Sequence, residues 1–126
     1  MANSAANKAF VARSAAILTT GEVAASRLDL NLCWGGLVSV DVDFTLGSLT
    51  NGILRFYVSA DGTTYKPVAV GGAVVSETIT ADATRAYLFP ALPGWKWFRA
   101  TIQGTGTVTS SSATITYRRL APGSQV

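Results

Sequence analysis

The stretch that decides the fold runs Val38-Ser39-Val40-Asp41-Val42-Asp43-Phe44-Thr45-Leu46. Apolar and polar residues alternate through it without exception. Successive side chains of a β-strand point to opposite faces of a sheet, so the alternation predicts a strand with its apolar side chains buried and the others in solvent. A helix would not place the same apolar residues on one side.

Segments of similar character lie on both sides of this strand. We predict further strands at 23–32, 53–59, 65–70, 73–80, 84–89, 95–103 and 108–117, and either a strand or an extended arm at 9–20. Turn signals separate them: a loop at 47–52 that ends in Asn51-Gly52, the turn Asp61-Gly62, and further turns at 71–72, 90–94 and 104–107. Pro67 has no N–H to donate, so its strand is expected at a sheet edge.

The number and spacing of these segments indicate the fold class. Short strands with turn signals about every 8 to 12 residues predict an all-β protein, an antiparallel β-sandwich or jelly-roll-like barrel of about eight strands with extended terminal arms. A chain of 126 residues fits one domain with a core of its own. We expect an N-terminal arm at 1–8, the β-sandwich domain at 9–118 and a C-terminal tail at 119–126.

The composition favours a binding protein with a weakly charged surface. Charged residues make up 13% of the chain, against about 25% in an average protein. The net charge is +3, but the arginines are scattered and form no basic stripe with aromatics, so we expect no nucleic-acid partner. The N-terminus lacks signal-peptide features, and no apolar run reaches the roughly 18 residues of a membrane span. We therefore expect no membrane partner and synthesis in a cytoplasm.

Few residues have the chemistry that catalysis requires. The chain has no histidine, and its one cysteine, Cys33, lies in an apolar run where it is interpreted as a small buried side chain. Asp41 and Asp43 share one face of their strand, and such a pair could serve a glycosidase or a calcium site. We interpret them as the solvent side of a half-buried strand. The sequence predicts no catalytic residue, no metal site, no cofactor and no enzyme.

The most informative cluster for binding is Trp95, Trp97 and Arg99, which the predicted strand 95–103 places on one face, opposite Phe98 and its apolar neighbours. Tryptophan and arginine are the residue types that dominate interface energetics. The cluster is either a protein interface, a platform for a sugar ring, or the second packed face of a buried strand. Arg118 and Arg119, at the start of the tail, are further interface candidates.

Two motifs carry a resemblance to a known group of proteins. The segment 54–68 has a strand followed by Ser59-Ala60-Asp61-Gly62-Thr63 and an aromatic residue, and a later segment reads Leu92-Pro93-Gly94-Trp95-Lys96-Trp97-Phe98-Arg99-Ala100. This layout, over residues 36 to 118, resembles small β-sandwich accessory proteins of tailed-phage virions. Sugar-binding sandwiches use the same Asp-Gly-Thr hairpin.

The resemblance implies a capsid cement or decoration subunit on the capsid surface of a virion. Its expected partners are the major capsid protein and copies of itself, as a homotrimer or homodimer. A tail, collar or fibre component with a carbohydrate- or receptor-binding sandwich is the alternative.

Overall fold

The alternating stretch forms β4 (Leu37–Thr45), an inner strand of a four-stranded antiparallel sheet. The structure is a computed structural model that describes residues 9–30, 36–91 and 94–120. The strand order in this sheet is β1 (Ala9–Ala16), β12 (Ser112–Leu120), β4 and β10 (Ala83–Pro90). The predicted arm 1–8, the tail residues 121–126 and Cys33 lie outside the described residues.

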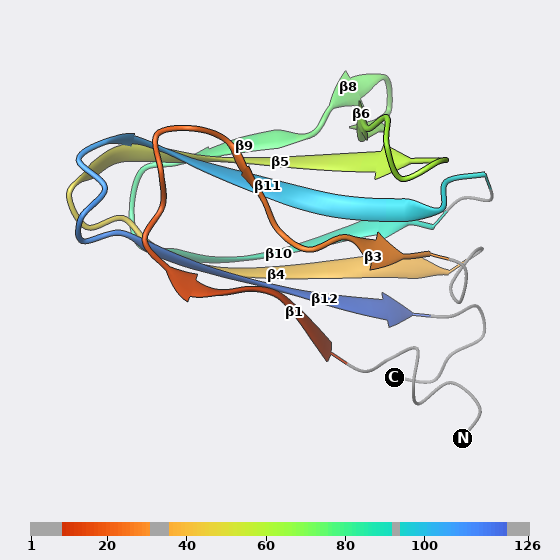
Figure 1. Ribbon diagram of the computed structural model, residues 1–126, viewed down its shortest axis with the longest axis horizontal. Coiled ribbons are helices and arrows are strands. Elements are labelled where there is room, and N and C mark those ends of the chain that lie inside the picture. The colour runs from red at the N-terminus through yellow and green to blue at the C-terminus, as the bar shows by residue number, and fades with distance from the viewer. Residues whose placement is uncertain (1–8, 31–35, 92–93, 121–126) are drawn as a thin grey trace.

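A six-stranded sheet packs over the first as a second layer (Figure 1). Its main path is β2 (Val23–Ala24), β11 (Trp97–Gly106), β5 (Leu49–Ser59) and β6 (Lys66–Pro67). Beside this path, β3 (Leu28–Asp29) pairs with β11, and β9 (Ser76–Ile79) pairs with β5. The short strands β7 (Ala69–Val70) and β8 (Ala73–Val74) form a separate hairpin.

The core lies between the two sheets and is built from the alternation in the sequence. Val38, Val40, Val42 and Phe44 of β4 are buried as predicted, and Leu46 is half-buried against them. The inward residues of the other long strands are also confirmed; they are Leu54 and Phe56 of β5, Phe98, Ala100 and Ile102 of β11, and Ala113, Ile115 and Tyr117 of β12. The all-β antiparallel sandwich is thus confirmed. In the described residues it has twelve strands, and neither sheet closes into a barrel.

The second half of the predicted loop 47–52 and most of the predicted turn 104–107 lie inside strands, β5 and β11, so these parts of the prediction are wrong. Asn51 and Gly52 belong to β5, where they pair with Thr105 and Gly104 of β11. Gly52 is required by packing, since a Cβ there would lie 2.5 Å from ring atoms of Phe44 in the opposite sheet. The chain turns at the beginning of the predicted loop, around Gly47, whose φ is +56°. The start of β11 at Trp97 leaves Trp95 outside the strand.

Other predicted strands are shorter or longer than expected. The segment 23–32 is divided into β2 and β3, and 73–80 into β8 and β9. The last strand continues through Leu120, so Arg118 and Arg119 lie in β12. The edge position of Pro67 is confirmed, since among the described strands β6 pairs with β5 alone.

The sides of the sandwich are closed by contacts between the two sheets. On one side, Glu77 of β9 accepts hydrogen bonds from Arg85, at 2.7 Å, and from the hydroxyl of Tyr87, both on β10. On the other side, the N–H of Ser26 donates to the carbonyl of Ala12 at 2.9 Å. These contacts join the two layers along both sides of the sandwich.

Candidate functional site

The structure separates the residues of the predicted Trp95, Trp97 and Arg99 cluster. Trp97 and Arg99 lie in β11 and point away from the core, because their neighbours Phe98 and Ala100 point into it. Trp95 instead packs against the core and lines an apolar pocket of about 300 Å³ with Val58, Val68, Pro90 and other residues of the β6–β7 region. Trp95 and Trp97 therefore do not share one flat surface.

Arg118 and Arg119 point to opposite sides of β12. Arg118 is on the outer face of the four-stranded sheet, where it forms an ion pair with Asp41 at 2.7 Å. Arg119 is directed toward the other sheet, and its Nη1 lies 3.4 Å from the carbonyl oxygen of Asp29 in β3. The five predicted interface residues thus lie on four separate parts of the molecule.

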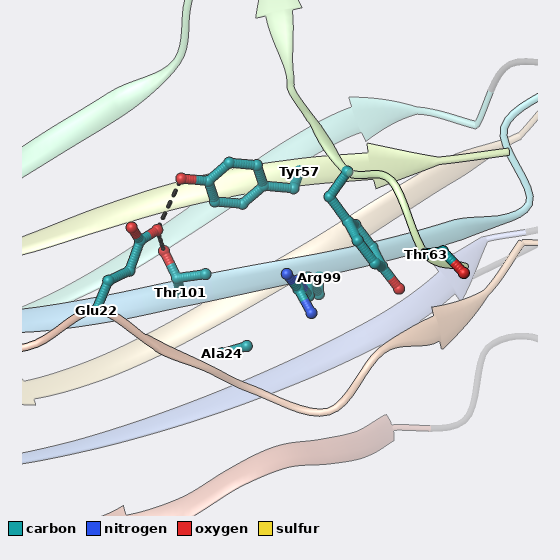
Figure 2. Close-up of a pocket in the computed structure, with 7 residues that line it drawn as sticks. Glu22, Ala24, Tyr57, Thr63, Arg99 and Thr101 are labelled. Carbon is teal, nitrogen blue, oxygen red and sulfur yellow. Dashed lines mark hydrogen bonds between the residues drawn. The ribbon is translucent and has the colours of Figure 1, made fainter. Parts of the chain in front are cut away.

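A pocket opens beside Arg99 on the outer face of the six-stranded sheet (Figure 2). Its volume is about 360 Å³, and it is open to solvent along one side. The residues that line it come from β2 and the residue before it, from β5 and β11, and from the segment that follows β5; they are Glu22, Ala24, Tyr57, Thr63, Tyr65, Arg99 and Thr101. We call it the outer-face pocket. Arg99 is the one predicted interface residue in its lining.

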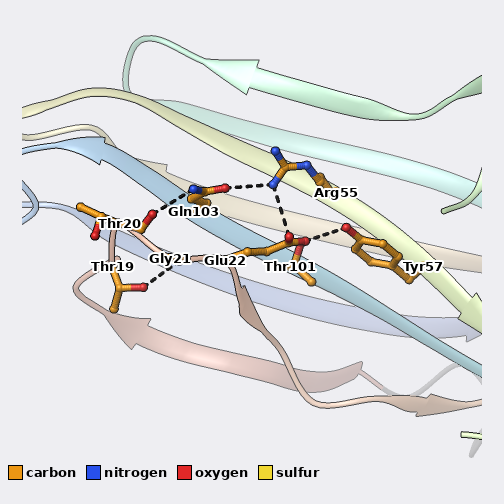
Figure 3. Close-up of polar contacts among 8 residues, drawn as sticks. All are labelled: Thr19, Thr20, Gly21, Glu22, Arg55, Tyr57, Thr101 and Gln103. Carbon is orange, nitrogen blue, oxygen red and sulfur yellow. Dashed lines mark hydrogen bonds and ion pairs between the residues drawn. The ribbon is translucent and has the colours of Figure 1, made fainter. Parts of the chain in front are cut away.

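One wall of the outer-face pocket is a hydrogen-bond network centred on Glu22 (Figure 3). Its Oε2 accepts hydrogen bonds from the hydroxyls of Tyr57, at 2.7 Å, and Thr101. Its Oε1 lies 3.6 Å from Nη1 of Arg55, which also donates to Gln103 at 3.0 Å. Both oxygens of Glu22 therefore already have partners in the protein.

This network also fixes the titration of its members. Burial acts to raise the pKa of Glu22, but the hydrogen bonds from Thr101 and Tyr57 and the charges of Arg55 and Arg99 together lower it below its ordinary value. Burial and the bond to Glu22 raise the pKa of Tyr57. Glu22 is accordingly a carboxylate, and Tyr57 a neutral donor, at neutral pH.

The opposite wall is held by the turn that follows β5. The Oδ1 atom of Asp61 accepts the N–H groups of Thr63 and Thr64, each at 2.8 Å, and the hydroxyl of Ser59 at 3.0 Å. Gly62 adopts a φ of +81° and donates to Ser59 Oγ at 2.8 Å. The prediction of a turn at Asp61-Gly62 is confirmed, and this turn places Thr63 at the pocket.

Cations lie over aromatic rings along this face. The guanidinium carbon of Arg99 is 3.8 Å from the ring centre of Tyr65, and that of Arg27 is 3.9 Å from the ring centre of Trp97. Such stacking is a favourable cation–π arrangement. One face of Tyr65 and one face of Trp97 are thereby occupied, so a sugar ring could stack on that face only if it displaced an arginine.

Two polar atoms at the pocket lack partners. Within the described residues, no hydrogen-bond acceptor reaches the Nε of Arg99 or the hydroxyl of Tyr65, although both atoms are buried. No ion pair among the described residues includes Arg99. Buried polar groups in folded proteins are nearly always paired, so these two unpaired groups are a feature of the pocket that needs an explanation.

Sequence reasoning missed most of the pocket. Glu22, Tyr57 and Tyr65 were not singled out, although Tyr57 shares the outward parity of Arg55.

In the described part of the chain, no group of three or more acidic or cysteine side chains is arranged to hold a metal ion. The same residues include no helix with the length and apolarity to cross a membrane.

The fold and the pocket define a class: an antiparallel β-sandwich with a polar, aromatic pocket on the outer face of its larger sheet. A solved structure of this fold is that of the SPBc2 prophage-derived protein YomS, which matches with a TM-score of 0.54 over 88% of this chain and 90% of that chain. The sequences are 12% identical, so the likeness concerns the fold. No protein-family model matches the chain, and no curated protein matches it.

Proposed function

We propose that the chain is a phage virion structural protein, a capsid cement or decoration subunit that binds the assembled shell through the outer face of its six-stranded sheet. In this proposal it acts by binding and not by catalysis. It meets the major capsid protein and further copies of itself, as a homotrimer or homodimer on the capsid surface. It stabilises the shell because it binds the assembled lattice in preference to separated subunits.

The observation that carries the proposal is the set of side chains on this face. Trp97, Arg99, Tyr57 and Tyr65, with Arg27 over Trp97, bring together the residue types in which interface binding energy is concentrated. They stand on a rigid sheet, where little conformational entropy remains to be lost on binding. The fold of a prophage-derived protein supports a phage origin, as does the resemblance of the hairpin and Trp-Lys-Trp segments.

The alternative, a tail, collar or fibre component that binds carbohydrate, has less support from this geometry. A sugar platform needs free aromatic faces, but an arginine occupies one face of Trp97 and one face of Tyr65, and Trp95 packs against the core. A blank glycan array would count against this alternative, and a specific hit lost on Trp97→Ala would favour it.

Particles made with and without this chain provide the test. We expect particles that lack the chain to release their DNA at a lower temperature and after milder osmotic shock, and purified protein to restore resistance. Equal resistance of the two kinds of particle would overturn the proposal. Light scattering of the free protein tests the proposed homotrimer or homodimer.

Two matched arginine variants locate the interface. Arg99→Gln changes the outer face of the six-stranded sheet, and Arg118→Gln changes the outer face of the other sheet. We expect Arg99→Gln protein to be lost from particles on washing and Arg118→Gln protein to be retained. The opposite pattern would show that the interface is on the four-stranded sheet, which carries the predicted interface residue Arg118.

A further inference from the structure

We propose that the outer-face pocket is a carboxylate-binding site that receives an acidic side chain of a partner protein, held by Arg99 and Tyr65. This inference deepens the proposed function, on which it rests for the partner being a protein. It names the chemistry that the partner must present. It also assigns Tyr65, which no sequence pattern indicated, to recognition.

The first argument is the pair of unmet donors. The Nε–H of Arg99 and the hydroxyl of Tyr65 are both buried and both lack an acceptor within the described residues. Each unpaired buried group costs free energy that a ligand oxygen would recover. The Nε–H of Arg99 can only donate, so its partner must be an acceptor, and the hydroxyl of Tyr65 is able to donate as well.

The second argument is charge. Arg27, Arg55 and Arg99 lie on this face, and Arg55 is paired with Glu22, while Arg99 has no ion pair within the described residues. The carboxylate of Asp61, at the end of the same face, accepts hydrogen bonds from its own turn. An anion is therefore favoured beside Arg99. Glu22 does not recruit a cation here, because both its oxygens already have partners.

The third argument selects a carboxylate over a phosphate. A guanidinium donates two parallel N–H groups to a planar carboxylate, which matches its geometry. Glu22 lines the same pocket, so an incoming group meets one negative charge across it. A dianionic phosphate suffers about twice the repulsion from Glu22 that a singly charged carboxylate does. A pocket of about 360 Å³ open at one side admits a side chain whose backbone remains outside.

Nuclear magnetic resonance of the isolated protein tests the site. The probes are a short acetylated and amidated peptide of glutamates, the matched peptide of glutamines, and inorganic phosphate, all at constant ionic strength. We expect the glutamate peptide to shift the Arg99 Nε–Hε signal and the amides of Thr63, Tyr65 and Thr101. The glutamine peptide should not shift these signals, and phosphate should shift them only at higher concentration.

Variants make the test specific. Arg99→Gln should lower the affinity for the glutamate peptide by about tenfold or more, which is the loss expected for a charge-assisted contact. Tyr65→Phe should lower this affinity less, and Arg118→Gln should leave the affinity unchanged. If Arg99→Gln fails to fold, the titrations of the wild type and of Tyr65→Phe still show whether the pocket binds a carboxylate. Equal shifts with both peptides, or tighter binding of phosphate, would overturn the carboxylate site.

The peptide titration and the particle experiment can fail independently of each other. A glutamate peptide that binds at Arg99, with particles indifferent to the chain, would retain the site and reject the capsid role. Arg99→Gln protein that is lost from particles, with no peptide binding, would retain the interface and reject the carboxylate.

Discussion

The backbone N–H of Ala100, in the six-stranded sheet, donates a hydrogen bond of 2.8 Å to the hydroxyl of Tyr117, in the four-stranded sheet. Its position explains the contact. Strand β11 pairs with β2 at Thr101 and with β3 at Phe98, and Ala100 lies between these two short ladders. Its carbonyl accepts from the N–H of Ala25, and Tyr117 supplies the partner for its N–H. A side chain of one sheet thus completes the hydrogen bonding of the other.

Removal of this hydroxyl should destabilise the fold. Tyr117→Phe keeps the buried ring but leaves the N–H of Ala100 without a partner, so we expect the free energy of unfolding to fall by about 1–3 kcal/mol. Urea denaturation measures the change. Tyr65→Phe is the control: its hydroxyl has no partner within the described residues, so stability should not fall. Equal losses in the two variants would contradict the role of Tyr117.

The same hydroxyl predicts a loss of stability in alkali. Burial raises the pKa of Tyr117 well above its ordinary value of 10.0. Above that value the unfolded chain releases the proton while the folded protein keeps it. The stability is therefore complete below pH 10.0 and falls as the pH rises toward the folded-state pKa, by up to about 1.4 kcal/mol per pH unit. Denaturation curves from about pH 9 to about pH 11 should be less steeply pH-dependent in Tyr117→Phe, and parallel slopes would refute this.

The contact between Gly52 and Phe44 should make Gly52 intolerant of a side chain. The Cβ of Gly52→Ala would lie 2.5 Å from two ring atoms of Phe44, which is buried, so the two sheets would have to shift. We expect a loss of about 1–3 kcal/mol, as for other overpacked cores. Gly21→Ala is the matched control, because a Cβ there meets nothing within 4 Å. Thermal unfolding of both variants tests the difference.

Glu77 should contribute an acid-sensitive part of the stability. Burial acts to raise the pKa of Glu77, but the bonds from Tyr87 and Arg85 and the charge of Arg85 bring it below its ordinary value of 4.5. Its contribution is present above that value and is lost as the pH falls through the folded-state pKa.

The matching variant is Glu77→Gln. It should be less stable than the wild type at neutral pH by less than about 1 kcal/mol, because the pair with Arg85 is partly exposed. It should also lose less stability between about pH 5 and about pH 3. Urea titrations at the two pH values measure this, and an unchanged acid dependence would exclude Glu77 as its source.

The alternation from Val38 to Leu46 was sufficient to predict β4 and the buried side of the sandwich, because one sheet face must meet a core. The glycines were not predictable in the same way. Asn51-Gly52 has the composition of a turn, but Gly52 is needed where Phe44 of the facing sheet approaches, and Gly104 where Leu49 approaches. A single sequence does not contain the identity of the side chain that lies opposite.

The site was predictable only in part for a similar reason. Parity along the strand 95–103 placed Trp97 and Arg99 on one outward face. The other pocket residues are distant in sequence: Glu22 reaches the pocket because β2 pairs with β11, and Tyr57 lies directly opposite Arg99 in the register of β5. Trp95 was misplaced because β11 begins two residues later than its apolar pattern indicated.

The pairing of β1 with β12 brings together the two ends of the described part of the chain. Ala9 of β1 lies opposite Arg118 of β12, so the described domain starts and finishes on adjacent strands, about 5 Å apart. A linker that joins these strands would close the polypeptide into a ring, and the ring could be reopened at the exposed turn Gly71-Gly72 without loss of any pairing in the two large sheets. The protein is therefore a natural scaffold for circular permutation.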